Sequence, residues 1–332
     1  MKRLLAIILI AAAAWSGYWY IAQSSARAGF ERWFAQRRAE GWQADYAALS
    51  MAGYPNRVDA TFEKPILADP ETGLGWEAPD FHIYALSYKP SQLIVSWPEQ
   101  QKIFTPEASY TISSRDMGAS IVMAPKPKLP LQRANLVSKA MAIEAPGGTT
   151  TLDGLQVAFD LVPGTTQDYR IGLNADGYAP PLPAGLTLQT GGQVPQQLDA
   201  LKADLTVSFS RPWDITALQD NRPQPTRIKV KLAEAKWGAL ELALAGDLTI
   251  DARGHPTGAL TLKARNWRDI LALARELGWL PAAWLDTTEQ ALSLAAQLSG
   301  NQRTLDLPLT FTPTGVSLGP VPLGPSPVLR LR

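Results

Sequence analysis

Residues 227–264, RIKVKLAEAKWGALELALAGDLTIDARGHPTGALTLKA, decide the fold class. Within this stretch Ile228, Val230 and Leu232 alternate with basic residues, so a strand here has one apolar face and one basic face. The same alternation recurs in further runs of Leu and Ile, which flank a predicted turn at residues 251–258. The pattern is typical of a one-sided antiparallel sheet that is built from consecutive hairpins.

Short strand signals also fill residues 53–207, where Pro and Gly separate them. The clearest predicted strands are 81–86, 92–97, 110–113 and 120–123, with a turn at 115–118 between the last two. Because no helical periodicity interrupts these strands, they favour antiparallel meanders over a parallel sheet. The sequence therefore predicts a mainly β fold, an antiparallel meander domain.

Two short helices near the C-terminus are predicted to cover the apolar face of this sheet. The first is expected at 267–278, where Asn266 provides a cap and Trp267 is the largest residue of an apolar stripe. The second is expected at 287–299, after a start at Asp286 that is similar to a capping box.

The N-terminus contains an apolar run from Leu4 to Ala22, between Lys2-Arg3 and Arg27. Its 19 residues would form a helix of about 28 Å, which is long enough to cross the hydrocarbon core of a bilayer. Four residues in its second half have rings that prefer the interface between membrane and water: Trp15, Tyr18, Trp19 and Tyr20. We therefore expect a transmembrane anchor over residues 1–25.

A cleaved signal peptide is the alternative interpretation of this segment. Its apolar region would be residues 4–14, and small-x-small cleavage sites occur at 14–16 and 26–28. The first site would place Trp15 at the point of cleavage, and the second lies far from the apolar region. We expect an uncleaved single-pass anchor in a bacterial inner membrane. The main domain is expected in the periplasm, because it is rich in Gly and Pro and lacks cysteine.

Residues 26–48 combine aromatic side chains with several Arg and predict an amphipathic helix next to the membrane. Such a helix either lies on lipid headgroups or packs its aromatic residues onto the β domain, and the sequence favours neither. Trp33 and Phe34 are therefore candidate contacts for lipid or for a partner protein. The remaining residues, 49–332, form the predicted β-rich domain, with a potential division into two sub-domains near 180–203.

Composition excludes several classes of site. The chain has no Cys and two His, so disulfides, thiolate metal sites and a His-rich metal centre are excluded. Residues 1–40 have a net charge of +4 and the rest of the chain has −3, which argues against a nucleic-acid partner. His82 in a strand and His255 in a turn are expected to be structural. With no nucleotide-binding, zinc-protease or nucleophile-elbow motif, we predict no catalytic, cofactor-binding or metal-binding residues.

Several short motifs carry a resemblance to a known family. They are GYPNR at 53–57, WEAP at 76–79, LPLTF at 307–311 and LGPVPLGP at 318–325. Together they resemble the bacterial envelope family catalogued as domain of unknown function 2125. The resemblance implies a membrane-tethered protein and supplies no catalytic residues and no cofactor. In the first motif Pro55 favours an extended Tyr54, and Arg57 is suited to contact an oxyanion such as phosphate. Tyr54 and Arg57 are therefore candidate ligand or partner residues.

Two functions of different classes are compatible with the sequence. The first is a non-enzymatic, membrane-anchored envelope protein that shelters a lipid or another apolar ligand, or that scaffolds envelope partners. An uncovered apolar sheet face would favour lipid handling, and a fully packed face would favour the scaffold. The alternative is a periplasmic hydrolase with paired carboxylates, although sequence spacing alone brings no two acids together. The sequence does not indicate an oligomeric state.

Overall fold

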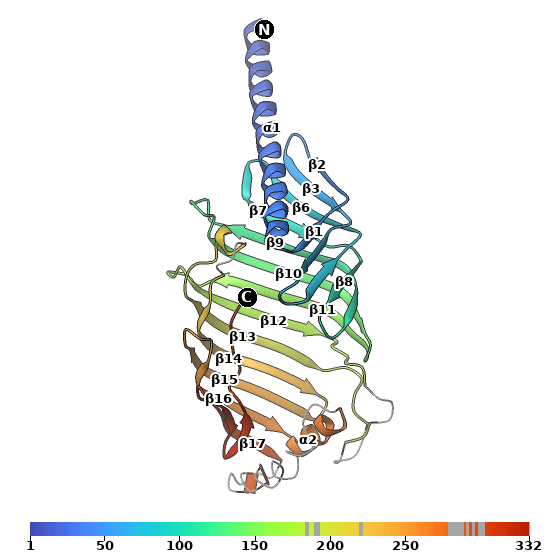
Figure 1. The fold of residues 1–332 in the computed structure, drawn as a ribbon, viewed down its shortest axis with the longest axis vertical. Helices are drawn as coiled ribbons and strands as arrows, with labels where there is room; N and C mark the ends of the chain where they lie inside the picture. Colours follow the sequence, from blue (N-terminus) through green and yellow to red (C-terminus); the bar gives the residue numbers. More distant parts are fainter. Residues whose placement is uncertain are drawn as a thin grey trace. The chain divides into compact units, whose positions relative to one another are not determined.

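The computed structural model (Figure 1) describes residues 1–182, 186–188, 193–218, 222–277, 289, 292–293, 296–297 and 303–331. The chain forms two compact units, and each has its own hydrophobic core. Unit 1 comprises Met1–Pro125 and Ala134–Thr149, and unit 2 comprises Lys126–Arg133 and Thr150–Arg332. The chain therefore passes between the units at residues 125–150 and not near 180–203, where the sequence indicated a division.

The N-terminal segment of unit 1 is one continuous helix, α1 (Lys2–Ala39). It is long and apolar enough to cross a membrane, as expected for the anchor predicted over residues 1–25. The amphipathic helix predicted at 26–48 is the second half of α1, and it ends earlier than expected. Gly41 has a left-handed backbone with φ of +91°, which terminates the helix. Two strands follow: β1 (Gln43–Asp45) and β2 (Ala48–Ala52).

The strands of unit 1 pair antiparallel in two branches that share one long strand, β9 (Ser109–Met123). The first branch runs β9-β7-β6-β3-β2, and the second runs β9-β8-β5-β4-β1. The further bounds are β3 (Arg57–Glu63), β4 (Ile66–Asp69), β5 (Leu74–Glu77), β6 (Asp80–Leu86), β7 (Lys89–Ser96), β8 (Gln100–Phe104) and β10 (Leu131–Ala145).

The turn that the sequence predicted at 115–118 is wrong, because β9 continues through these residues. Its two halves pair with different strands: Ser109–Ser113 with β8 and Gly118–Val122 with β7. Asp116 lies between the halves with φ of +52°. The polar sequence there marks the fork of the sheet and not the end of a strand.

The core of unit 1 lies between the second half of α1 and the first branch of the sheet. Phe34 and Phe62 are both buried, with their rings stacked at 5.5 Å between centroids. Phe30 and Tyr46 meet the Phe62 ring edge-on. Of the two alternatives for the amphipathic segment, the structure shows the one in which its aromatic residues pack onto the β strands.

Unit 2 is a meander in which each strand pairs antiparallel with the next one along the chain, as Figure 1 shows for β11 to β17. Its elements are β11 (Gly148–Leu161), β12 (Asp168–Asp176), β13 (Ala200–Phe209), η1 (Ile215–Leu218), β14 (Pro225–Trp237), β15 (Leu240–Ile250), β16 (Pro256–Arg265), α2 (Trp267–Glu276), β17 (Thr304–Phe311), β18 (Val316–Leu318) and β19 (Val321–Gly324). The antiparallel meander predicted from residues 227–264 is confirmed.

One of the two predicted covering helices is present, as α2. Its start differs in detail from the prediction: the Asn266 side chain makes no capping bond and donates its Nδ2–H to the Ala239 carbonyl at 2.7 Å. Trp267 is buried against the sheet, as expected. The second helix, predicted at 287–299, lies mostly outside the described residues and is not confirmed.

Candidate functional site

The strand pairings of unit 2 align apolar residues in rows across one face of its sheet. One such row, which we call the central row, crosses seven strands: Val157, Leu173, Ala203, Ala233, Leu244, Leu262 and Leu307. Further apolar rows flank it on both sides. Because directly paired residues of antiparallel strands share a face, the register makes this side of the sheet continuously apolar. We call this side the apolar face.

The central row differs from the outer rows in its exposure to solvent. Every member of the central row is partly exposed. In the outer row on one side Tyr169 is 0% exposed and Val207 is buried. In the outer row on the other side Leu305 is 4% exposed and Ala264 is buried. The apolar face is therefore buried most deeply near both ends of its strands, and its central row is only partly covered.

An aromatic cluster covers one end. Tyr169 stacks on Phe159 at 4.4 Å between ring centroids, and Trp213 meets Phe209 edge-on at 5.4 Å. The Tyr169 hydroxyl donates a hydrogen bond to the Leu131 carbonyl at 2.9 Å, so its polar end is paired. Burial raises the pKa of Tyr169, which therefore stays neutral at physiological pH. The packed rings of this cluster bury the apolar face at that end of its strands.

At the other end α2 lies over the strands and leaves a cavity of about 190 Å³. Trp237 and Leu240 of the sheet form one wall, and Ile270 and Leu273 of α2 form another. The Trp237 indole N–H donates to the Pro195 carbonyl at 2.6 Å. Apart from Glu241, the lining is built from apolar and aromatic side chains. The side chains of α2 therefore do not completely fill the space above this end of the apolar face.

The opposite face of the same sheet is polar and ion-paired. Arg170 donates two hydrogen bonds of 2.8 Å to the carboxylate of Asp204, and Lys231 lies 3.2 Å from it. The Arg170 hydrogen bonds are the main reason that the pKa of Asp204 is lowered. Arg227 lowers the pKa of Asp247 in the same way. This face suits contact with water.

Leu232 was predicted on the apolar face and lies on the polar one. A register shift between Val230 and Ala233 inserts an extra residue into β14. Leu232 therefore pairs with Asp204 and is 39% exposed. A bulge reverses the side on which the following residues point, which simple alternation cannot anticipate.

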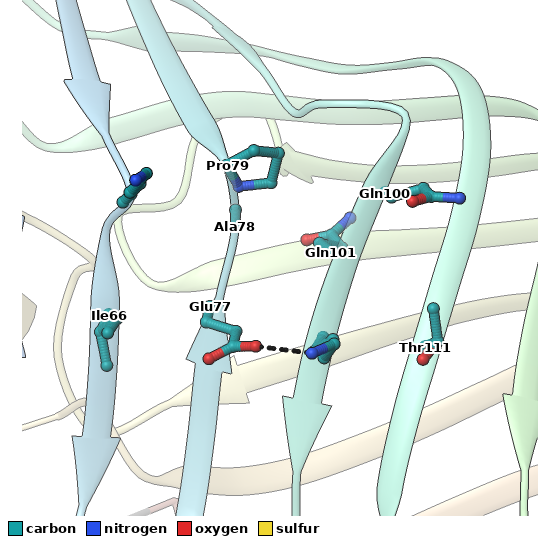
Figure 2. Close-up of a pocket in the computed structure, with 9 residues that line it drawn as sticks. Ile66, Glu77, Ala78, Pro79, Gln100, Gln101 and Thr111 are labelled. Atoms are coloured by element: carbon teal, nitrogen blue, oxygen red, sulfur yellow. Dashed lines mark ion pairs between the residues drawn. The ribbon is translucent and has the colours of Figure 1, made fainter.

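A cavity of about 440 Å³ lies in the second branch of unit 1 (Figure 2). Its floor is a row of paired residues on four neighbouring strands: Ile66, Glu77, Lys102 and Thr111. Glu77 and Lys102 form an ion pair at 3.0 Å. Among the described residues of the lining Glu77 is the one carboxylate, so this cavity lacks the two acids that a paired-carboxylate mechanism needs.

The structure brings Tyr54 and Arg57, two of the predicted site residues, together in the turn before β3. The Tyr54 hydroxyl lies 2.8 Å from Ser16 Oγ of α1. The Arg57 guanidinium forms an ion pair with Asp59 at 2.8 Å and lies 6.0 Å from the centre of the Tyr84 ring. Both side chains remain largely exposed.

Trp33 and Phe34, the other two predicted site residues, lie elsewhere. Phe34 is buried in the core of unit 1, and Trp33 packs against it edge-on at 5.1 Å. Near them a cavity of about 140 Å³ separates α1 from the first branch of the sheet, where Ala22, Ala26 and Phe30 form its helical wall. The site residues that sequence reasoning missed are the central row. Their signal was present as alternation in each strand, but their alignment depends on the pairing register.

Among the described residues no group of three or more His, Asp or Glu side chains is placed to hold a metal ion. Comparison with protein families gives one match over most of the chain. The family model described as an uncharacterized protein conserved in bacteria, DUF2125, matches residues 19–327. No curated protein and no solved structure matches the chain significantly.

Proposed function

The chain belongs to the bacterial DUF2125 family, and we propose that it is a membrane-tethered, non-enzymatic envelope protein that holds lipid acyl chains on the apolar face of unit 2. α1 is the tether. The occupant of the face is the acyl chain of a membrane phospholipid, and no cofactor takes part.

The partial exposure of the central row is the observation that carries this proposal. Each CH₂ group that moves from water to an apolar surface stabilises a complex by about 0.8 kcal/mol. The row consists of Val, Leu and Ala, so it offers no polar group to a headgroup or to a polar substrate. A long hydrocarbon chain gains more from such a surface than any other common ligand. A scaffold for a partner protein would not need the middle of the face to stay open.

The dimensions of the face fit this occupant. Seven strands at a spacing of about 4.8 Å make the central row about 29 Å long. The hydrocarbon core of a bilayer is about 30 Å thick and contains two chains end to end, so one chain occupies about 15 Å. One acyl chain therefore fits along the row with room to spare.

Photocrosslinking tests the proposal. The full-length protein, reconstituted with a phospholipid that carries a diazirine near the end of one acyl chain, is illuminated and digested, and the labelled peptides are identified. We expect labelled peptides from β12 to β16 in addition to those from α1. Leu173→Glu and Leu244→Glu, which place a charge in the central row, should abolish labelling of the strands.

Leu232→Glu is the matched control, because it introduces the same charge into the same sheet on the polar face. Labelling of the strands should be unchanged in this variant. If labelling were confined to α1, or if all three variants behaved alike, the apolar face would not hold lipid.

The periplasmic side is part of the proposal and has a separate test. A reporter that is active only in the periplasm, fused after Arg332, should be active, and the N-terminus of the mature protein should be Met1. An inactive reporter would reverse the orientation. A mature N-terminus at Gly17 or Gly29 would identify a signal peptide instead of an anchor.

A further inference from the structure

Two turns of unit 1 lie against the first half of α1, inside the apolar run. They are Gly53–Arg57 and the turn at Ser87 and Tyr88, which we call the tip. The Trp15 indole N–H donates to the Pro55 carbonyl at 3.0 Å, and the Trp19 indole N–H donates to the Arg57 carbonyl at 2.6 Å. The Tyr18 hydroxyl donates to the Ser87 carbonyl at 2.7 Å. The Trp19 ring also meets the Tyr54 ring edge-on at 5.3 Å.

The length of the apolar run sets the depth of the tip. The run from Leu4 to Ala22 has about the length of the hydrocarbon core, so a spanning α1 needs nearly all of it inside the bilayer. Ser16, which contacts Tyr54, precedes Ala22 by six residues, or about 9 Å along the helix. Trp19, which contacts Arg57, precedes it by about 4.5 Å. The tip must therefore lie below the membrane surface when α1 spans.

The hydrogen bonds of the tip suit this environment. A non-helical backbone in the hydrocarbon region is tolerated only when its polar groups are satisfied within the protein. The carbonyls of Pro55, Arg57 and Ser87 accept bonds from α1 side chains. Within the tip, Arg57 N–H donates to the Gly53 carbonyl and Ser87 N–H donates to the Asn56 carbonyl. The same bonds satisfy the indole donors of Trp15 and Trp19 and the hydroxyl of Tyr18, which would otherwise face lipid.

The side chains of the tip are also of the kind found at membrane interfaces. Tyr54 is 58% exposed and Tyr88 is 57% exposed, which is unusual for large rings that face only water. Arg57 sits at the level of Trp19, close enough to the surface for its long side chain to reach the phosphate layer.

We propose that the tip of unit 1 is inserted in the lipid leaflet on the side of the β strands, with Tyr54 and Tyr88 in contact with acyl chains and Arg57 among the phosphates. This inference rests on α1 spanning the membrane and is independent of lipid binding by the apolar face of unit 2. It makes the membrane contact of this protein a composite of one helix and two turns.

Site-specific labelling tests the insertion directly, because the chain has no cysteine of its own. Single variants Tyr54→Cys and Tyr88→Cys of the full chain are labelled with an environment-sensitive fluorophore and reconstituted in phospholipid vesicles. Ile10→Cys is the control inside the bilayer. Leu74→Cys, an exposed residue at the start of β5, is the control in water. Quenching by lipids that carry a spin label in the acyl chain is then measured.

We expect quenching at positions 54 and 88 that is comparable to that at position 10, and none at position 74. Two tip positions are used so that a folding defect in one variant does not decide the result. Quenching at position 10 with none at 54 and 88 would overturn the proposal while leaving the anchor intact. The absence of quenching at position 10 would overturn both. Lipid crosslinking to unit 2 is measured separately, so its failure does not affect this result.

Discussion

Units 1 and 2 are both built on strands that alternate apolar and polar residues, yet the resulting apolar face is covered to different extents in the two units. In unit 1 the second half of the 38-residue α1 packs Phe30 and Phe34 into the face of the first branch. In unit 2 the ten-residue α2 covers one end of the strands, and the central row stays partly exposed. The contrast teaches that the alternation creates an apolar face, and that the segments packed on this face decide how much of it becomes a core.

The same comparison explains the double character of α1. Its first half is apolar on all sides, as a bilayer requires, and its second half has one aromatic side that the sheet requires. One helix of unit 1 therefore combines a segment that is long and apolar enough to cross a membrane with a segment that forms the core. In unit 2 no described residue of the central row is fully buried.

The largest effect is expected for Phe62→Ala in unit 1. Phe62 contacts four other aromatic rings, so its removal should cost free energy of unfolding near the upper end of ~3–5 kcal/mol. Hydrogen exchange followed by mass spectrometry should show faster exchange in β2, β3 and β6 and little change in unit 2. Equal acceleration in both units would mean that they do not have independent cores.

Trp267→Ala should cost about 3 kcal/mol in unit 2. The ring is buried, but half-buried neighbours such as Leu262 and Ile270 surround it and can partly refill the space. The readout is the melting temperature together with exchange in β15 to β17. An unchanged melting temperature would mean that α2 does not pack on the sheet, and the apolar face would then be open at both the middle and this end.

Leu173→Ala, in the central row, should cost about 1 kcal/mol or less, because a partly exposed side chain leaves no closed cavity. Leu248→Ala, in an outer row on a nearby strand, removes the same atoms from a buried site and should cost ~2–4 kcal/mol. Chemical unfolding of the two variants measures this difference. Equal costs would show that the face is closed, and the contrast between the two units would disappear.

The polar face predicts a small pH dependence. Arg170 lowers the pKa of Asp204 in the folded protein, so the pair stabilises the fold above the ordinary aspartate value of about 3.9. This contribution is lost as the pH falls through the lowered pKa. Asp204→Asn should reduce the free energy of unfolding by less than about 1 kcal/mol near neutral pH, because the pair is at the surface. The variant and the original protein should converge in acid, and a gap that persists there would require another cause.

The smallest effect is expected for His255→Ala, within about 0.5 kcal/mol. The turn depends on the backbone N–H of His255, which donates to Asp251 Oδ1 at 2.9 Å and is retained in the variant. The imidazole Nδ1 is buried without a hydrogen-bond partner, so its loss leaves no bond unmade. If the variant kept its stability but lost a cellular function, His255 would have a functional role and not only a structural one.

Local sequence patterns predicted the features that depend on neighbouring residues. The long apolar helix follows from the run after Lys2-Arg3, the meander from the alternation after Arg227, and α2 from the stripe that begins at Trp267. The position of Leu232 was mispredicted because a bulge depends on the partner strands. The turn predicted near Asp116 was wrong because the fork at β9 depends on two strands that are distant in the sequence.

The candidate site was harder to predict for the same reason. Tyr54 and Arg57 were identified by their turn, but their contact with α1 joins residues about 40 positions apart. Phe34 was predicted to contact lipid or a partner protein and instead lies in the core of unit 1. The sequence could not distinguish these cases, because a helix with aromatic residues on one side has the same pattern whether that side meets lipid or a sheet. Whether the central row is open depends on what covers it, which no single strand encodes.

The meander of unit 2 has a consequence for how such a protein can change in length. Every strand from β11 to β19 pairs with its neighbours in the chain, so the hairpins with short connections, such as β14-β15 and β15-β16, can form soon after their second strand is synthesised. An added or deleted hairpin would leave the pairing of all the others intact. The apolar face could thus grow or shrink in steps of two strands, about 10 Å each, without a new topology.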